Sequence, residues 1–313
     1  MGKLKKVNCI IDTDPGVDDV AAIALSLYDE VMDIKLITTV AGNLDINTVT
    51  RNALHVLEKF NRTDITVAVG ASQALERISP DAAHVHKSEG MGNYIPPKNV
   101  KNKPIEQDAV EAMYEAVKKD AGNIVILALG PHTNVAKLIK KHPEVVAMIN
   151  HIYCEGCAPY GLKGENHISF NVSSDPEAFK IVIESGIPVT IIPSRMGREQ
   201  SNLNEEQVFN LREINDTGRF LYEMYNGYWE RGYPDRRVAL NDTCAVMIFR
   251  FPHIFKTKNT FFDVDTGEQP GKTVITFNRK GNVNYAIGVN RKKLHKLFFN
   301  AVKKMDQFKF YND

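Results

Sequence analysis

The sequence has few of the features that mark secreted, membrane or nucleic-acid-binding proteins. Only four of its 313 residues are cysteines, and its formal charge is +1 at neutral pH. A chain so close to neutrality is not expected to bind nucleic acid through an excess of positive charge. No apolar stretch is long enough to cross a membrane, and the one behind the N-terminal lysines is too short for a signal peptide. We therefore expect a cytoplasmic protein without a membrane or nucleic-acid partner.

Two of the cysteines, Cys154 and Cys157, have the spacing of a metal-binding or redox pair. No second cysteine pair and no histidine pair at zinc spacing accompanies them, and a structural zinc ion needs four ligands. We interpret them as two thiols at the end of a buried strand.

Apolar runs separated by segments of helical spacing extend through the first two-thirds of the chain. Six of these runs are typical of buried strands, at 7–11, 34–40, 65–69, 123–129, 149–154 and 189–192. Alternation of strands and helices favours an α/β, Rossmann-like fold, in which helices flank a mostly parallel central sheet.

The remaining segments complete this expectation. Two long loops are expected at 71–104 and 155–174, a helical region at 204–250, two strands at 273–277 and 283–289, and a final helix at 291–304. No repeat, low-complexity segment or linker composition divides the chain. We therefore expect a single domain over residues 1–313.

Four aspartates stand close together where the first strand gives way to a helix. Asp12, Asp14, Asp18 and Asp19 surround a Pro-Gly turn signal, which puts them at the edge of the sheet where ligands bind in open α/β folds. Close carboxylates repel unless protons or a cation neutralise them, and a hard divalent ion prefers oxygen ligands. A plainer interpretation, that two of them favour the positive end of a helix, leaves the other two unexplained.

The segment Asp-Thr-Asp-Pro-Gly-Val-Asp-Asp at 12–19 resembles the N-terminal motif of the nucleoside hydrolase family of the inosine-uridine-preferring type. Members of that family cleave the N-glycosidic bond of nucleosides with a bound calcium ion. The resemblance implies a Ca²⁺-dependent N-glycosyl hydrolase that converts ribonucleosides into ribose and free base, in nucleoside catabolism or purine salvage. It also implies a homodimer or homotetramer.

Weaker matches follow along nearly the whole chain. Asn43 stands where the family has an asparagine in its metal and ribose site, and His86 opens a segment similar to the loop that borders this site. The segments 129–136, 169–178 and 241–246 resemble the family's LGPLTNVA, EFN…DPEA and HDP-type segments. Taken alone, each match has an ordinary alternative, such as a turn residue or a helix N-cap.

The resemblance also implies a role for each matching residue. Asp14 would be the general base that activates a metal-bound water, whereas Asp18 and Asn171 would bind ribose hydroxyls and Asp12 would orient its neighbours. The calcium would be held by Asp14, Asp19, Asp242 and the backbone carbonyl of Leu129. An acidic site of this kind stabilises the positive charge that develops on the sugar during glycoside hydrolysis.

Two residues depart from the family's pattern, and the first is Ser169. It replaces a glutamate that binds ribose hydroxyls in the family, and a ribose-binding asparagine further upstream corresponds by spacing to Lys163. Glu165 and Asn166 lie close by in the sequence, so we regard them as candidates to bind ribose instead.

The second departure is Asn241, which replaces a histidine that protonates the leaving base. Because asparagine does not titrate, it cannot be a general acid. Tyr225, Tyr228 and Trp229 on an expected helix are candidates to stack on the base or relay a proton, and Tyr225 and Trp229 share one face. They are equally compatible with a core, so the choice between purine and pyrimidine stays open.

Two other functions remain as alternatives. A haloacid-dehalogenase-type phosphatase would use Asp12 as a nucleophile, but Gly16 departs from its motif and the pair Asp18 and Asp19 has no role there. A non-catalytic binder of ribose or nucleosides is suggested by Ser169 and Asn241. The four close aspartates argue against it, because they are electrostatically costly without a metal to bind.

Overall fold

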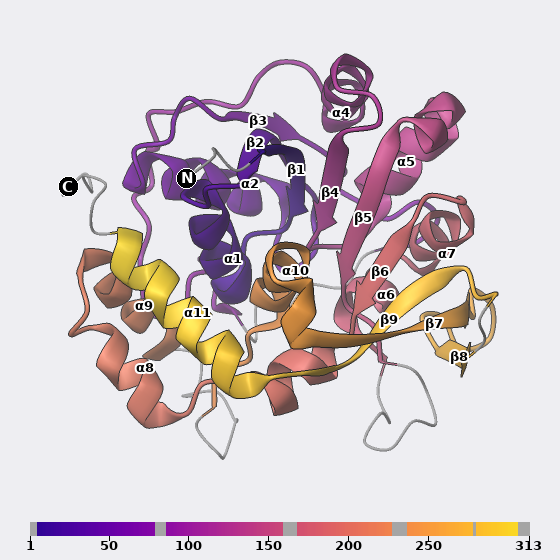
Figure 1. The fold of residues 1–313 in the computed structure, drawn as a ribbon. Helices are drawn as coiled ribbons and strands as arrows, with labels where there is room; N and C mark the ends of the chain where they lie inside the picture. Colours follow the sequence, from indigo (N-terminus) through magenta and orange to yellow (C-terminus); the bar gives the residue numbers. More distant parts are fainter. Residues whose placement is uncertain (1–4, 79–85, 159–167, 227–236, 278–279, 306–313) are drawn as a thin grey trace.

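The computed structural model has one nine-stranded sheet with helices packed on both of its faces (Figure 1). It describes residues 5–78, 86–158, 168–226, 237–277 and 280–305. The strands in chain order are β1 (Val7–Thr13), β2 (Met32–Thr39), β3 (Thr66–Val69), β4 (Ile124–Ala128), β5 (Ile149–Glu155), β6 (Val189–Ile192), β7 (Phe255–Val264), β8 (Thr273–Phe277) and β9 (Val283–Val289).

The strands follow the spatial order β3-β2-β1-β4-β5-β6-β9-β7-β8. All pairs from β3 to β9 are parallel, whereas β7 is antiparallel to both β9 and β8. The expected α/β architecture with a mostly parallel sheet is therefore confirmed.

The α-helices in the described ranges are α1 (Val17–Leu27), α2 (Ile46–Lys59), α4 (Ala109–Lys119), α5 (Thr133–Lys141), α6 (Phe170–Ser174), α7 (Pro176–Glu184), α8 (Glu205–Leu211), α9 (Asp216–Asn226), α10 (Asn241–Arg250) and α11 (Arg291–Lys304). Successive side chains of a strand point to opposite faces of the sheet, so the buried side chains form two cores, one on each face. Ile11 belongs to the core that includes residues of α1, α2, α9, α10 and α11, whereas its neighbour Ile10 belongs to the core that includes residues of α4, α5 and α7.

Two local expectations were wrong. The sequence predicted only two strands after residue 261, but β7 adds a ten-residue strand over Phe255–Val264. Its polar stretch from Lys256 to Asn259 is largely exposed and conceals the strand pattern. The short helix α6 interrupts the expected loop 155–174, and the Ser174 hydroxyl donates to the Phe170 carbonyl at 2.8 Å within it.

The four cysteines are buried free thiols, and Cys154 lies within β5, as expected for thiols at the end of a buried strand. No helix in the described ranges combines the length and apolar character that crossing a bilayer demands.

Candidate active site

Buried carboxylates from four elements gather beside the carboxyl ends of β1, β4 and β5. Asp14 follows β1, Asp18 and Asp19 lie in the first turn of α1, Glu155 ends β5, and Asp242 lies in the first turn of α10. Each side chain is at most 8% exposed. The helices α1 and α10 pack against each other, which brings together residues more than 200 positions apart in the sequence.

Asp19 is fixed by donors from three parts of the chain. Its Oδ1 accepts from the Thr13 hydroxyl at 2.5 Å, and its Oδ2 accepts from the Gly16 amide at 3.0 Å and from Asn43 Nδ2 at 3.1 Å. The contact with the Gly16 amide satisfies one of the unpaired N–H groups at the start of α1. The carboxylate is therefore held in one orientation before any ligand binds.

Asp14 lies in a cradle formed by two glycines and an asparagine. The Asn43 amide donates to Asp14 Oδ2 at 2.7 Å, and Asn43 Nδ2 donates to the Asp14 carbonyl at 3.0 Å. A Cβ atom added at Gly42 would lie 2.2 Å from Asp14 Oδ2, and one added at Gly130 would lie 2.7 Å from Oδ1. The backbone approaches this carboxylate so closely that a side chain at either position would displace it.

Three of the carboxylates are close enough to share one cation. Oxygen atoms of Asp18, Asp19 and Asp242 all lie within 4.8 Å of one another. This triad contains two of the predicted metal ligands, Asp19 and Asp242, and also Asp18, which the sequence predicted to bind ribose. Asp14 stands outside the triad, although its charge contributes to raising the pKa of Asp242.

The electrostatics of the cluster favour an added positive charge. Burial, followed by the charges of neighbouring carboxylates, raises the pKa of Asp14, Asp19 and Asp242. Burial alone outweighs the hydrogen bonds that Asp18 accepts and raises its pKa to about 6. Groups with these shifts take up protons unless a cation compensates their charge. The donor set therefore suits a hard divalent ion, which binds carboxylate and carbonyl oxygens.

Asn171 in α6 connects the ends of β4 and β5. Its Nδ2 donates to the Leu129 carbonyl at 2.6 Å and to Glu155 Oε2 at 2.9 Å. The expected carbonyl of Leu129 thus lies at the site together with Asn171. The sequence prediction did not include Glu155, although a glutamate directly after a buried apolar strand is a signal of the same kind as Asp14.

Asn241, His86 and Tyr225 border the cluster. Asn241 Nδ2 donates to Asp18 Oδ2 at 3.3 Å, and His86 Nδ1 accepts from the Val17 amide at 3.1 Å. Tyr225 is fully buried, and its hydroxyl has no hydrogen-bond partner in the described ranges. Burial, and then the charges of Asp18 and Asp242, raises its pKa, so this hydroxyl keeps its proton at neutral pH.

The other predicted site residues divide into those that are described and those that are not. Ser169 is 3% exposed, and its hydroxyl oxygen lies 3.4 Å from that of Ser194. The other residues that the sequence analysis considered lie outside the described ranges: Lys163, Glu165, Asn166, Tyr228 and Trp229.

Asp12 lies within β1 and binds its neighbours in the sheet. Its Oδ1 accepts from the Thr38 hydroxyl at 2.6 Å and from Asn134 Nδ2 at 2.8 Å. Asn134 Nδ2 also donates to the Thr39 carbonyl at 2.9 Å. Asp12 therefore joins β1 to β2 and to the start of α5.

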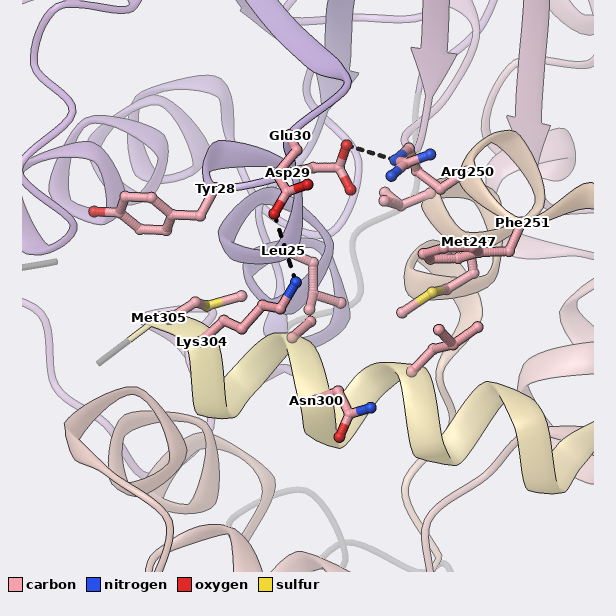
Figure 2. Close-up of a pocket in the computed structure, with 13 residues that line it drawn as sticks. Leu25, Tyr28, Asp29, Glu30, Met247, Arg250, Phe251, Asn300, Lys304 and Met305 are labelled. Atoms are coloured by element: carbon pink, nitrogen blue, oxygen red, sulfur yellow. Dashed lines mark hydrogen bonds and ion pairs between the residues drawn. The ribbon is translucent and has the colours of Figure 1, made fainter. Parts of the chain in front are cut away.

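A pocket lies at the ends of α1 and α10 that are opposite to the carboxylates (Figure 2). Apolar side chains such as Leu25 and Met247 line it, and Arg250 Nε forms an ion pair with Asp29 Oδ1 at 2.5 Å. An eleven-residue helix such as α1 rises by roughly 16 Å, so this pocket is separate from the carboxylates at the other end.

Comparison with known proteins gives one consistent family. The model of the family described as "Inosine-uridine preferring nucleoside hydrolase" matches residues 9–296. The non-specific ribonucleoside hydrolase RihC of Escherichia coli O127:H6 is 33% identical over 288 residues, which cover 90% of this chain and 93% of the relative.

Solved structures agree with this result. The purine-preferring ribonucleoside hydrolase from Gardnerella vaginalis superposes with a TM-score of 0.88 at 27% identity, covering 96% of this chain and 99% of that one. The plant nucleoside hydrolase PpNRh1 superposes with a TM-score of 0.83 at 26% identity, covering 95% of this chain and 99% of that one.

Proposed function

The chain belongs to the inosine-uridine preferring nucleoside hydrolase family, and on this premise we propose that it hydrolyses the N-glycosidic bond of ribonucleosides with a bound calcium ion. The products are ribose and the free base. The observation that carries the proposal is the buried triad of Asp18, Asp19 and Asp242, whose oxygens lie within 4.8 Å of one another. Family membership confirms the expected class of N-glycosyl hydrolase and removes the phosphatase alternative.

The calcium would be held by Asp14, Asp19, Asp242 and the carbonyl of Leu129. These groups offer only oxygen donors, and the raised pKa values of the three carboxyls favour a compensating cation. A bound divalent ion makes a coordinated water more acidic and a better nucleophile. Asp18, whose carboxylate belongs to the triad, lies close enough to interact with both the ion and the sugar.

Asp14 is the general base in this proposal. It removes a proton from the attacking water while the water oxygen forms a bond to C1′ of the ribose. The C1′–N bond breaks, and its electron pair leaves on the nitrogen of the base. The transition state carries positive charge on the sugar ring, which the surrounding carboxylates stabilise.

The ribose is oriented by Asp18 and Asn171. Asp18 Oδ2 accepts from Asn241 at 3.3 Å, and this contact orients the carboxylate that would accept a hydrogen bond from a sugar hydroxyl. Asn171 Nδ2 already donates to the Leu129 carbonyl and to Glu155 Oε2, so Asn171 would bind a sugar hydroxyl through its Oδ1, which accepts. Asn43 and His86 do not need to touch the sugar, because their hydrogen bonds hold Asp14, Asp19 and the start of α1.

The leaving base is activated without an ionisable group at position 241. Asn241 is a hydrogen-bond donor to Asp18 and supplies no proton. The buried Tyr225 hydroxyl is the described group that combines a transferable proton with proximity to Asp18 and Asp242. We place it beside the base, where its hydrogen bond lowers the cost of the negative charge that develops there.

The test is product analysis with a nucleoside panel. Inosine, guanosine, adenosine, uridine and cytidine are incubated with the calcium-loaded protein, and free base and reducing sugar are quantified separately. Equal amounts of base and ribose are expected from at least one nucleoside. An Asp242→Asn variant should lose this release, whereas Asp216→Asn, at an exposed ion pair with Arg219, should retain it.

The opposite result would favour the non-catalytic alternative. If nucleosides bind to the calcium-loaded protein and none is cleaved, Ser169 and Asn241 have removed turnover, and the proposed hydrolysis is wrong.

We further propose a single domain, a cytoplasmic location and a homodimer or homotetramer. The four free buried thiols are consistent with a reducing compartment. The apolar side chains of Phe261, Val274 and Phe277, which are 53%, 53% and 44% exposed, support a subunit contact on β7 and β8. Light scattering of the purified protein would reveal a monomer if this assembly is wrong.

A further inference from the structure

We propose that Glu155 binds a hydroxyl group of the ribose in the substrate. The inference rests on the proposed function, because it assigns a further residue to the same sugar site. No motif in the sequence and no comparison gives this residue a role. It is the last residue of β5, and its side chain is 5% exposed.

The contacts of Glu155 fix one of its oxygens and leave the other available. Oε2 accepts from Asn171 Nδ2 at 2.9 Å, and the same nitrogen donates to the Leu129 carbonyl at 2.6 Å. Oε1 is buried and has no hydrogen-bond partner among the residues that the structure describes. A buried acceptor without a donor costs free energy, so a hydroxyl group on the ligand supplies what this oxygen lacks.

Glu155 also lies within the electrostatic field of the cluster. The charges of Asp18 and Asp19 act on it, and it acts in turn on Asp242. In the described ranges, however, the carboxylates whose oxygens lie within 4.8 Å of one another are those of Asp18, Asp19 and Asp242. Glu155 is therefore near the cation position without belonging to the triad, which suits a sugar contact better than a metal contact.

Ser169 is the neighbour that explains why a carboxylate stands at position 155. A Cβ atom added at Gly156 would lie 3.0 Å from Ser169 Oγ and 2.9 Å from Asn171 Cβ, so α6 packs directly against the residue after Glu155. The hydroxyls of Ser169 and Ser194 are 3.4 Å apart.

The site therefore has room for one carboxylate, either at position 155 or at position 169. A glutamate at position 169 would bring a second carboxylate against Glu155, and like charges at this distance repel in a buried site. We infer that β5 supplies the carboxylate and that α6 supplies the small neutral Ser169 beside it. The two positions are alternatives for the same function.

The experiment compares sugar recognition by wild type and Glu155→Gln, which keeps the shape of the side chain and removes its charge. The probes are methyl β-D-ribofuranoside and its 2-, 3- and 5-deoxy analogues, and dissociation constants are measured by calorimetry at saturating calcium. Glu155→Gln should bind the full riboside about 10- to 100-fold more weakly. Wild type should bind the deoxy analogue that lacks the hydroxyl held by Glu155 more weakly than the full riboside. In Glu155→Gln this difference in affinity should nearly disappear.

Two further variants complete the design. Glu213→Gln is the matched control, because Glu213 is exposed and forms an ion pair with Arg212. It should behave as wild type with all four probes. The double variant Glu155→Gln with Ser169→Glu returns a carboxylate to the neighbouring position and should recover part of the lost affinity. Glu155→Gln is expected to fold, because removing a buried charge relieves repulsion in the calcium-free protein.

Several outcomes would overturn the proposal. Undiminished discrimination against all three deoxy analogues in Glu155→Gln would show that Glu155 does not touch the sugar. Loss of calcium affinity with unchanged discrimination would make it a metal ligand. Because binding is measured without turnover, a protein that shows the expected discrimination and releases no base would refute the proposed hydrolysis alone.

Discussion

Asp12 offers a quantitative test of the electrostatics beneath the site, through the variant Asp12→Asn. The side chain is fully buried, its Oδ1 accepts from Thr38 and Asn134, and its Oδ2 has no partner among the described residues. Burial outweighs the two hydrogen bonds and raises the pKa of Asp12 from 3.8 to about 6. Asparagine retains an oxygen for both donors and carries no charge.

The direction of the pH dependence of stability follows from proton linkage. Because the folded state binds the Asp12 proton more tightly than the unfolded state, the contribution of Asp12 to the free energy of unfolding falls as the pH rises from about 4 to about 6 and then stays level. Relative to Asp12→Asn, the wild type loses about 2 kcal/mol at pH 5 and about 3 kcal/mol at pH 8. The variant should therefore gain about 1 kcal/mol over wild type between these two pH values.

The assay is urea unfolding of both calcium-free proteins at pH 5 and pH 8. At each pH the quantity of interest is the difference in unfolding free energy between variant and wild type. A pH-independent cost of the new amide group changes this difference equally at pH 5 and pH 8, so it cancels when the two are compared. The other titrating groups, which both proteins share, cancel in the same way. A difference in unfolding free energy that does not change with pH would refute the reasoning, because Asp12 would then ionise at its ordinary pKa in the folded state.

Three further predictions concern the cation. Asp242→Asn should weaken calcium binding at least 100-fold by calorimetry, because it removes one anion of the triad; an unchanged affinity would place the ion elsewhere. Gly197→Ala should weaken calcium binding about tenfold, because a Cβ there would lie 1.9 Å from Asn241 Oδ1 and would displace the start of α10. Gly267→Ala is the control and should leave calcium binding unchanged, because its Cβ would approach only Asp265 Oδ1, at 3.4 Å. Calcium affinity should rise as the pH rises through about 6, because the carboxyls around the ion have raised pKa values, that of Asp18 to about 6, and must lose their protons when the ion binds. Calorimetry in two buffers of different ionisation enthalpy would show the released protons, and their absence at pH 5.5 would contradict the raised values.

The part of the site that lies next to β1 could be predicted from the sequence. The apolar run before Asp12 and the Pro-Gly turn after Asp14 define a strand, a turn and a helix between Val7 and Leu27, and local periodicity identifies such units. The alternation of further strands and helices led to the parallel sheet for the same reason. The final helix was predicted at 291–304, where α11 lies.

The rest depended on packing between distant segments. The position of Asp18 in the triad with Asp242 is set by the contact of α1 with α10, which no local pattern reveals. Glu155 ends an apolar run as Asp14 does, but without a turn signal or a familiar motif its orientation toward Asn171 is visible only in three dimensions. The strand β7 was missed because exposed polar residues at one end of it hide its alternation.

The central claim is tested most directly by the dependence of catalysis on calcium. Protein freed of metal with a chelator is incubated with the nucleoside that the panel identifies as a substrate, and ribose release is followed as Ca²⁺ is added back. We predict no release from the calcium-free protein and a rate that rises in parallel with calcium binding, measured by calorimetry, to one ion per chain. Full release by protein without measurable calcium would contradict the assignment of the carboxylate cluster as the metal site of a hydrolase.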